Sequence, residues 1–330
     1  MRKQVTLRNV ADKAGVHVST VSRVLREERG RIKPETADRV VAVAQELGFQ
    51  RNRWAASLRS GKTGVLAVLV PRITDVVLAT VFESIESKAA QVGYQAVVSS
   101  TWDDPTSRDH QIRRYLGERV DGLIIGDARI RDPALSQMTR EGVPFLLVSR
   151  PSRGYPSVAG RDRYGGRLAA NHLLDRGTRN LAVIAGPDYA STAVERAGGF
   201  VTAARLRGVE ISRAAIVPST FDVVGGRVAM QKILARSQPD GVFAVNDYAA
   251  IGAMGALREA GLVPGEDVAV VGYNDIDVSA QLSVPLTSVR TPLEQLGALA
   301  VEGMLELLST GATRSVRLTP QLIPRQSTGA

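Results

Sequence analysis

Apolar residues in the first 25 positions recur at helical spacing on either side of Gly15. Four of them lie at i, i+3, i+4 and i+7, on one face of a short helix: Leu7, Val10, Ala11 and Ala14. Thr6 is suited to cap this helix and Gly15 to end it. A second helix is expected to begin near Val18 and to bury Val21, Val24 and Leu25. The pattern predicts a helix-turn-helix, with a packed helical hairpin as the alternative.

A third helix and a linker complete the predicted head. Pro34 suits a first helical position and Gly48 a helix end. The apolar stripe between them consists of Ala37, Val40, Val41, Ala44 and Leu47. Three helices with such faces can share one small core. Residues 50–63 have no stripe wide enough to anchor a helix, so we expect a linker that becomes helical only when it binds a partner.

From Gly64 onward, short apolar runs alternate with amphipathic segments. The runs predicted to be strands are 65–70, 95–99, 122–125, 145–148, 181–184, 241–245 and 268–271. Helices are predicted at 77–92, 164–175, 191–207, 223–234, 248–260 and 292–308. Because the runs are apolar at successive positions, the strands are expected to be parallel and covered on both faces. The alternation predicts an α/β core of two doubly wound parallel-sheet subdomains.

Polar residues follow several of the predicted strands. They lie at 71–77, 149–150, 185–188, 246–247 and 272–275. For a lone Asn or Asp, a turn or a helix cap is the commoner role. Ligands of open α/β sheets bind beyond the carboxyl ends of the strands, however, so these segments can converge on one cleft. Together they predict a binding site for a small, hydroxyl-rich molecule.

The positive charge of the chain is concentrated in its first fifth. Over 330 residues the net charge is +9. Residues 1–62 hold 14 Lys and Arg against 6 Asp and Glu, whereas the remaining residues hold 28 against 27. A basic head on a near-neutral body is typical of a protein that binds nucleic acid.

Other residue types argue against catalysis and export. Cysteine is absent and the three histidines lie far apart in the sequence, so we expect no thiolate nucleophile, no metal site and no Ser-His-Asp triad. Neither Gly-x-Gly-x-x-Gly nor Gly-x-x-x-x-Gly-Lys-Ser/Thr occurs, and no cofactor is expected. The chain begins without an apolar signal segment and has no apolar run of about 18 residues, which predicts a cytoplasmic protein without membrane contact. An enzyme and an exported sugar-capture protein are therefore the weaker alternatives.

Several short motifs together resemble the lactose/galactose repressor (LacI/GalR) family. They are Thr-Leu-x-x-Val-Ala-x-x-Ala-Gly-Val from Thr6, Ser-Thr-Val-Ser-Arg-Val-Leu from Ser19, Pro-Glu-Thr at 34–36, Leu-Gly-Phe at 47–49 and Asn-Arg-x-Ala-x-x-Leu from Asn52. The resemblance implies a helix-turn-helix domain at 1–50, a hinge helix at 51–62 and an effector-binding and dimerisation core, similar to periplasmic binding proteins, at 63–330. The core would comprise an N-subdomain, about 63–160 and 291–319, and a C-subdomain, about 161–290 and 320–330. The chain would cross between them near Arg161, Arg290 and Pro320.

The resemblance also implies contacts with operator DNA. The residues concerned are Thr6, Leu7, Val18, Ser19, Thr20, Ser22, Arg23, Asn52, Arg53, Ala55, Leu58 and Arg59. Val18 and Ser19 should set base preference, and Leu58 should wedge a base step in the minor groove. His17 and Lys33 stand where the family usually has a Ser helix cap, and the loss of such a cap should cost about 1 kcal/mol.

A second implied set contacts the effector. It consists of Asp75, Ser149, Arg150, Arg196, Phe221, Asn246 and Asn274. Arg196 would hold effector oxygens through its fixed donors, and Phe221 would pack on the apolar face of the effector. Ser149 and Asn274 stand where the family more often has Asp, which leaves room for an acidic or phosphorylated effector beside a neutral sugar.

These observations combine into one prediction. The chain is expected to be a homodimeric, ligand-responsive transcriptional repressor of carbohydrate uptake or catabolism genes, bound to a pseudo-palindromic operator. Its effector is expected to be a sugar or sugar derivative that changes the angle between the subdomains, either as an inducer or as a co-repressor.

Overall fold

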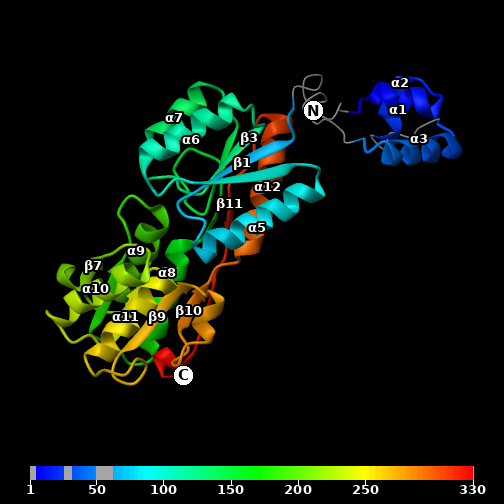
Figure 1. The fold of residues 1–330 in the computed structure, drawn as a ribbon. Helices are drawn as coiled ribbons and strands as arrows, with labels where there is room; N and C mark the ends of the chain where they lie inside the picture. Colours follow the sequence, from blue (N-terminus) through cyan, green and yellow to red (C-terminus); the bar gives the residue numbers. More distant parts are fainter. Residues whose placement is uncertain (1–4, 26–31, 50–61, 330) are drawn as a thin grey trace. The chain divides into compact units, whose positions relative to one another are not determined.

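The computed structural model describes residues 5–25, 32–49 and 62–329. They belong to two compact units, residues 1–63 and residues 64–330 (Figure 1). All of the predicted hinge helix except Lys62 therefore lies outside the described residues.

Three helices form the described part of the first unit: α1 (Leu7–Ala14), α2 (Val18–Val24) and α3 (Pro34–Glu46). Their shared core consists of Val10, Ala11, Ala14, Val21, Val24, Ala37, Val40 and Ala44. Thr6 caps α1, because its hydroxyl oxygen accepts a hydrogen bond from the Asn9 backbone N–H at 3.3 Å. Gly15 ends α1 with φ +64°, a conformation that glycine adopts without a steric penalty. These features confirm the predicted helix-turn-helix.

The cap of α2 corrects one expectation. His17 does not leave the helix uncapped, because its Nδ1 accepts a hydrogen bond from the Ser19 backbone N–H at 3.2 Å. An unprotonated imidazole nitrogen accepts a hydrogen bond as a Ser hydroxyl does, so the expected loss of a cap at this position is wrong. Lys33 makes no side-chain cap to α3, whose first residue, Pro34, has no N–H to satisfy.

Two six-stranded sheets form the second unit. The first, in the order β11-β5-β4-β3-β1-β2, is parallel throughout. Its strands are β1 (Val65–Val70), β2 (Gln95–Ser100), β3 (Gly122–Ile125), β4 (Phe145–Val148), β5 (Ser157–Gly160) and β11 (Val316–Leu318). The second, in the order β12-β10-β9-β8-β6-β7, is parallel except for the edge strand β12. Its strands are β6 (Leu181–Ala185), β7 (Ile216–Pro218), β8 (Gly241–Ala244), β9 (Ala269–Asn274), β10 (Thr287–Arg290) and β12 (Gln321–Ile323).

Helices cover both faces of each sheet (Figure 1). On the first sheet, α5 (Val76–Gln91) and α12 (Leu293–Thr310) lie opposite α6 (Pro105–Gly117) and α7 (Pro133–Arg140). On the second, α8 (Asp162–Asp175) and α9 (Ser191–Leu206) lie opposite α10 (Val223–Leu234) and α11 (Asp247–Glu259). Successive residues of β1 enter opposite cores, which explains why the strand is apolar at every position. Among the described helices, none is long and apolar enough to cross a membrane.

The chain passes between the two sheets three times. The passages lie at Arg161 between β5 and α8, at 291–292 between β10 and α12, and at 319–320 between β11 and β12. The Arg161 backbone N–H donates to the Leu318 carbonyl at 2.8 Å, so the first and third passages run side by side. Because β5 and β10 both lead into a passage at their carboxyl ends, the carboxyl ends of the parallel strands in both sheets face the junction between the subdomains. The fold therefore places ligand-binding positions of both sheets in one cleft.

Candidate functional site

The helix α2 presents the residues that were predicted to read DNA. Ser19 and Arg23 are exposed, whereas Val18, Thr20 and Ser22 are half-buried. The Val18 side chain also packs against the core of the head. Of the two residues predicted to set base preference, Ser19 is therefore the more accessible, although its hydroxyl oxygen lies 2.8 Å from His17 Nδ1.

The other predicted DNA contacts divide into two groups. Thr6 and Leu7 lie at the start of α1, where Thr6 is exposed and Leu7 packs partly against the core of the head. The remaining five, Asn52, Arg53, Ala55, Leu58 and Arg59, lie outside the described residues. Their roles remain predictions.

The described head has basic groups available for phosphates. Within residues 5–25 and 32–49, the ion pair Lys13–Glu46, at 2.6 Å, is the single one, and both of its side chains are exposed to solvent. Arg8 and Arg23 are exposed and have no carboxylate partner in that part of the chain. Unpaired cations on a surface can bind DNA phosphates and release their counterions.

A cleft between the two subdomains contains every predicted effector residue. The predicted residues in its lining are Asp75, Ser149, Arg150, Arg196, Phe221, Asn246 and Asn274. Asp162, Thr192 and Thr291 also line the cleft and were not predicted. The cavity measures about 60 Å³, well below the roughly 300 Å³ at which small-molecule pockets begin. A cavity of this size is too small for a sugar-sized ligand as it stands.

Arg196 is buried and held in place by three neighbours. Its Nε donates to Asp162 at 2.7 Å, and its Nη1 donates to the Val245 carbonyl at 2.9 Å. Its guanidinium carbon lies 3.8 Å from the centre of the Tyr273 ring. Burial is the largest single influence and acts to lower the pKa of Arg196, but Asp162, Tyr273 and Asp247 together outweigh it and the pKa is raised. The guanidinium therefore stays charged, and its Nη2 remains to bind a ligand.

Arg150 is likewise buried and paired. It forms two hydrogen bonds with the Asp103 carboxylate, at 2.6 and 3.1 Å. The same carboxylate accepts a hydrogen bond from the Tyr189 hydroxyl of the other subdomain at 3.3 Å. The Arg150 guanidinium carbon lies 5.5 Å from the centre of the Phe221 ring. Arg150 thus belongs to a polar bridge between the subdomains as well as to the cleft.

Two of the predicted effector residues are also helix caps. Asn246 caps α11 by accepting a hydrogen bond from the Ala249 N–H at 3.0 Å, and its amide donates to the Phe221 carbonyl at 2.9 Å. Asp75 caps α5 through the Val77 N–H at 3.0 Å. Burial raises the pKa of Asp75, whereas the nearby Arg150 and Arg196 oppose that shift. Asn246 therefore has one N–H left for a ligand, and Asp75 one carboxylate oxygen.

Three oxygen atoms in the lining are buried without a hydrogen-bond partner among the described residues. They are the Ser149 hydroxyl, the Asn274 amide oxygen and the Thr291 hydroxyl. Ser149 and Asn274 also have positive φ angles of 63° and 104°, which are strained for residues with a side chain. Each unpaired polar group costs about 1–3 kcal/mol when buried, and the hydroxyl groups of a ligand would satisfy all three.

The additional cleft residues follow from the fold. Asp162 begins α8, two residues after the end of β5, and Thr291 comes directly after β10; neither of these four-residue strands was predicted. The signal that could have identified them is position alone, because both residues lie within two residues of the carboxyl end of a strand. No group of three or more His, Cys, Asp or Glu suited to a metal ion is found among the described residues.

Comparison with known proteins matches both parts of the chain. The family model described as bacterial regulatory proteins, lacI family, matches residues 6–52, and a periplasmic binding protein-like domain matches residues 170–328. The HTH-type transcriptional regulator DegA of Bacillus subtilis (strain 168) is 30% identical over 332 aligned positions, which cover 98% of each chain. The ribose operon repressor of Escherichia coli (strain K12) is 30% identical over 328 positions, which cover 98% of this chain and 99% of the repressor.

A solved structure extends this likeness to the whole fold. The Lac repressor dimer bound to operator and the anti-inducer ONPF superposes with a TM-score of 0.89 at 29% identity, covering 99% of this chain and 100% of that one. The relatives are transcriptional regulators, which agrees with a helix-turn-helix joined to a ligand-binding core. The chain belongs to the lacI family of bacterial regulatory proteins.

Proposed function

We propose that this chain is a sequence-specific, DNA-binding repressor whose effector is a neutral sugar or sugar derivative held in the cleft. In this proposal residues 1–50 bind the operator, residues 51–62 form the hinge helix, and residues 63–330 bind the effector and dimerise. The function requires bacterial DNA as a partner, so we place the protein in the cytoplasm.

The observation that carries the proposal is the set of unpaired oxygens in the cleft. Ser149, Asn274 and Thr291 each hold a buried oxygen without a partner among the described residues. All three oxygens accept hydrogen bonds, and a sugar presents several hydroxyl donors in fixed directions. The half-buried ring of Phe221 offers an apolar face beside them. This combination of a few fixed polar groups and an aromatic ring is typical of a small-molecule site.

The charges of the lining favour a neutral effector over an acidic one. Arg196 is paired with Asp162, and Arg150 is paired with Asp103. Asp75 adds a further carboxylate to the same lining. The two cations are therefore already balanced, and the secondary idea of an anionic effector, which rested on the absent carboxylates at Ser149 and Asn274, loses its support.

The narrowness of the cleft links effector binding to a change of shape. A cavity of about 60 Å³ has to widen before a sugar enters, and the widening changes the angle between the subdomains. A ligand shifts such an equilibrium only through its different affinity for the two states. In the proposed repressor this shift alters the spacing of the two heads of a dimer and hence operator affinity.

Exposed valines support the dimer. Val224 on α10 is 71% exposed, and Val228, one turn further along the same face, is 41% exposed. Val76 and Val278, from opposite subdomains, line one further hollow and are also exposed. Apolar residues exposed in this way gain free energy when a second copy covers them. A twofold dimer presents two recognition helices, so the operator is expected to be a pseudo-palindrome.

The proposal is tested by a substitution that removes one of the three unpaired oxygens of the cleft. Thr291→Val removes the hydroxyl with little change of shape, and it breaks no hydrogen bond of the described structure. We expect a thermal-shift screen of neutral pentoses, hexoses and disaccharides to identify a stabilising ligand. The variant should bind that ligand about tenfold more weakly, because a buried hydrogen-bonding group left without its partner costs about 1–3 kcal/mol, and about 1.4 kcal/mol corresponds to a factor of ten.

Thr178→Val is the matched control. Thr178 also has a buried hydroxyl without a partner among the described residues, but it lies before β6, at the opposite end of the strands from the cleft. The control should bind the ligand as the unmodified protein does. Equal affinities of the Thr291→Val variant and the control would refute the proposed site.

A further inference from the structure

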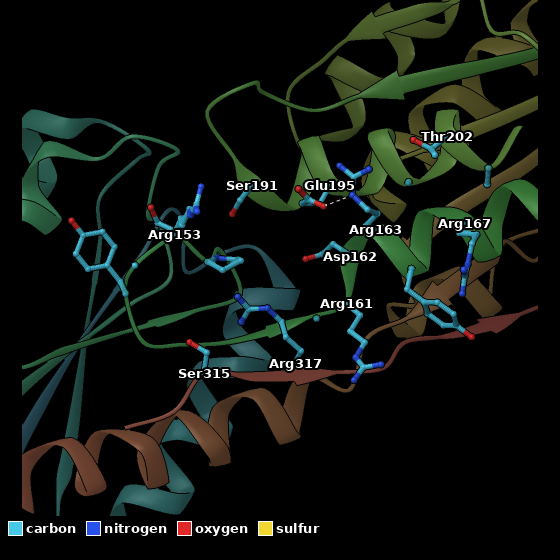
Figure 2. A pocket seen from close by; sticks show the side chains of 18 of the residues that line it. Arg153, Arg161, Asp162, Arg163, Arg167, Ser191, Glu195, Thr202, Ser315 and Arg317 are labelled. Atoms are coloured by element: carbon cyan, nitrogen blue, oxygen red, sulfur yellow. Dashed lines mark hydrogen bonds and ion pairs between the residues drawn. The ribbon is translucent and has the colours of Figure 1, made fainter. Parts of the chain in front are cut away.

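A groove of about 810 Å³ lies beside the first and third passages between the subdomains (Figure 2). Its walls come from residues 151–155 after β4, from Ser315 and Arg317 at β11, from the first half of α8, and from one side of α9 along its whole length, Ser191 to Leu206. It shares two lining residues, Gly160 and Asp162, with the effector cleft. The rest of its lining differs from that of the cleft, and it comes from both subdomains, so the groove is a second concave surface that adjoins the cleft.

Arginines surround this groove. Figure 2 shows Arg153, Arg161, Arg163, Arg167 and Arg317 around it. The acidic residues in the lining are already paired, Asp162 with Arg196 at 2.7 Å and Glu195 with Arg163 at 2.9 Å. The other four arginines have no carboxylate partner among the described residues. Since residues 63–330 carry a net charge of only +1, this is a local surplus of positive charge.

Two of these arginines, Arg167 and Arg317, contact neutral groups, so their positive charge is not neutralised and can attract an anion. The Arg167 guanidinium carbon lies 4.7 Å from the centre of the Tyr164 ring. Arg317 donates to the Ser157 hydroxyl at 3.0 Å, a neutral partner. Burial lowers the pKa of Arg317, which means that its charge is not fully solvated in this position. An anion in the groove would compensate that loss of solvation.

Two helices begin at the groove. The ion pair Arg163–Glu195 joins the first turn of α8 to the second turn of α9, and Arg207–Asp175 joins their ends, so the helices run parallel. Their N-caps, Arg161 and Ala190, make no side-chain cap, and the first N–H groups therefore have no side-chain acceptor. Helix N-termini attract anions through these groups.

The hydroxyl group of Ser191 is a further, independent indication that the groove binds a ligand. Ser191 lies in the groove lining at the start of α9 and is 7% exposed, and its Oγ has no hydrogen-bond partner among the described residues. A hydroxyl group is a good donor to phosphate oxygens.

We propose that the groove binds a small molecule that carries two phosphate groups and acts as a second ligand beside the effector. Arg153 and Arg317 approach from one subdomain, whereas Arg161, Arg163 and Arg167 lie on α8 or at its start in the other. A molecule with two phosphates can engage both sets, whereas a single phosphate reaches one. Sugar bisphosphates and nucleoside diphosphates share this chemistry, and both fit a groove of about 810 Å³.

The position of the groove makes the second ligand regulatory. A diphosphate that bridges the two subdomains at the passages restrains the same motion that opens the effector cleft. Its binding therefore changes the affinity of the cleft for the effector, and linkage requires the effector to change diphosphate affinity by the same factor.

The test measures binding of inorganic pyrophosphate to the full-length protein by calorimetry. The variant is Arg153→Gln with Arg167→Gln. Its matched control is Arg113→Gln with Arg236→Gln, which removes two exposed arginines that also lack a carboxylate partner in the described structure but lie outside the groove. Pyrophosphate should bind the unmodified protein and the control alike. Its affinity for the groove variant should fall at least about tenfold, because the variant removes two cations that donate charge-assisted hydrogen bonds to phosphate oxygens.

Further binding measurements identify the class of the ligand and the place where it binds. The affinities of ADP and of a hexose bisphosphate are compared with that of pyrophosphate, and the compound that binds more tightly indicates whether the natural ligand is a nucleoside diphosphate or a sugar bisphosphate. Equal pyrophosphate affinity of the two double variants, or no binding of any of the three compounds, would overturn the proposal. So would orthophosphate binding as tight as that of pyrophosphate, or a loss of pyrophosphate binding in Thr291→Val, which would place the anion in the effector cleft. A loss of operator affinity in the ligand-free groove variant would assign the arginines to DNA instead.

Discussion

The head and the effector core of this protein differ in the size of their buried side chains and in the exposure and pairing of their cations. The buried core of the head consists of Val and Ala alone, and the basic residues around it are exposed and mostly unpaired in the described part. In the effector core, large side chains fill four clusters, and the cations Arg150 and Arg196 are buried and paired. Unpaired surface cations suit a partner made of phosphates, whereas buried pairs shape a cavity. The two activities should therefore be separable by mutation.

The largest separation is expected from Val40→Asp. Val40 is fully buried in a core of eight small residues, and a carboxylate there has no partner. We expect the head to unfold and operator binding to be lost, while the effector core keeps its unfolding transition and its ligand affinity. Circular dichroism, operator binding and ligand titration measure the three properties. The control is Asp38→Asn, on the exposed face of the same helix, which should change none of the three properties. If the Val40→Asp variant still bound the operator, this description of the core of the head would be contradicted.

A second substitution, Arg196→Ala, should impair the effector core instead of the head. Arg196→Ala leaves Asp162 buried without its ion-pair partner, which should lower the free energy of unfolding of the core by about 3–5 kcal/mol and abolish effector binding. Denaturant unfolding and ligand titration measure these effects. Arg196→Met combined with Asp162→Asn should recover most of the stability without recovering the ligand. A single variant with unchanged stability would mean that the pair does not hold the cleft.

A smaller effect distinguishes base reading from helix capping. Ser19→Ala should weaken binding to the selected operator by about 1–3 kcal/mol and shift the preferred sequence. Its backbone N–H, which bonds to His17, is retained, so the head should stay folded. His17→Ala, the control, removes the cap and should cost the head about 1 kcal/mol of stability with no change of preferred sequence. Selection from random DNA that returned one consensus for all three proteins would contradict a reading role for Ser19.

The smallest effect concerns a carboxyl group near the cleft. Asp247 is buried, accepts hydrogen bonds from Ser288 and the Ile276 N–H, and burial raises its pKa from 3.8 to about 7. Between about pH 4 and 7 the folded state holds one proton more than the unfolded state, so stability falls as the pH rises and levels off above about 7.

Asp247→Asn removes this titration. Relative to the variant, the unmodified protein should lose about 1 kcal/mol between pH 5 and pH 6. Denaturant midpoints at pH 5, 6, 7 and 8 measure the difference. Parallel pH profiles of the two proteins would show that Asp247 ionises normally.

Sequence patterns predicted the elements that bury the most surface. The central strands β1, β3 and β4 were predicted with their observed bounds, because apolar residues at every position leave few alternatives to a parallel strand covered on both sides. The missed strands β5, β7, β10, β11 and β12 have three or four residues each, and their polar or small side chains resemble loop sequence. The helices α6 and α7 were also missed, since charged and polar residues dominate them.

The candidate site was predictable where a strand was recognised. Ser149 and Asn274 follow strands that were predicted, whereas Asp162 and Thr291 follow short strands that were not. The pairing of Arg150 with Asp103 could not be predicted, because the two residues are brought together by tertiary structure. That pairing balances one cation of the cleft lining, whereas the sequence pattern registered only the missing carboxylates at Ser149 and Asn274.

Operator affinity measured with and without effector tests the central claim most directly. The operator is selected from random DNA, and the neutral sugar found in the thermal-shift screen is titrated against the complex. At saturating sugar the operator affinity should change, and Thr291→Val should need about ten times more sugar than the unmodified protein and Thr178→Val to reach the same end point. Without sugar, all three proteins should bind the operator equally. An operator affinity that stays constant at saturating sugar, or one titration curve shared by all three proteins, would contradict a cleft-controlled repressor.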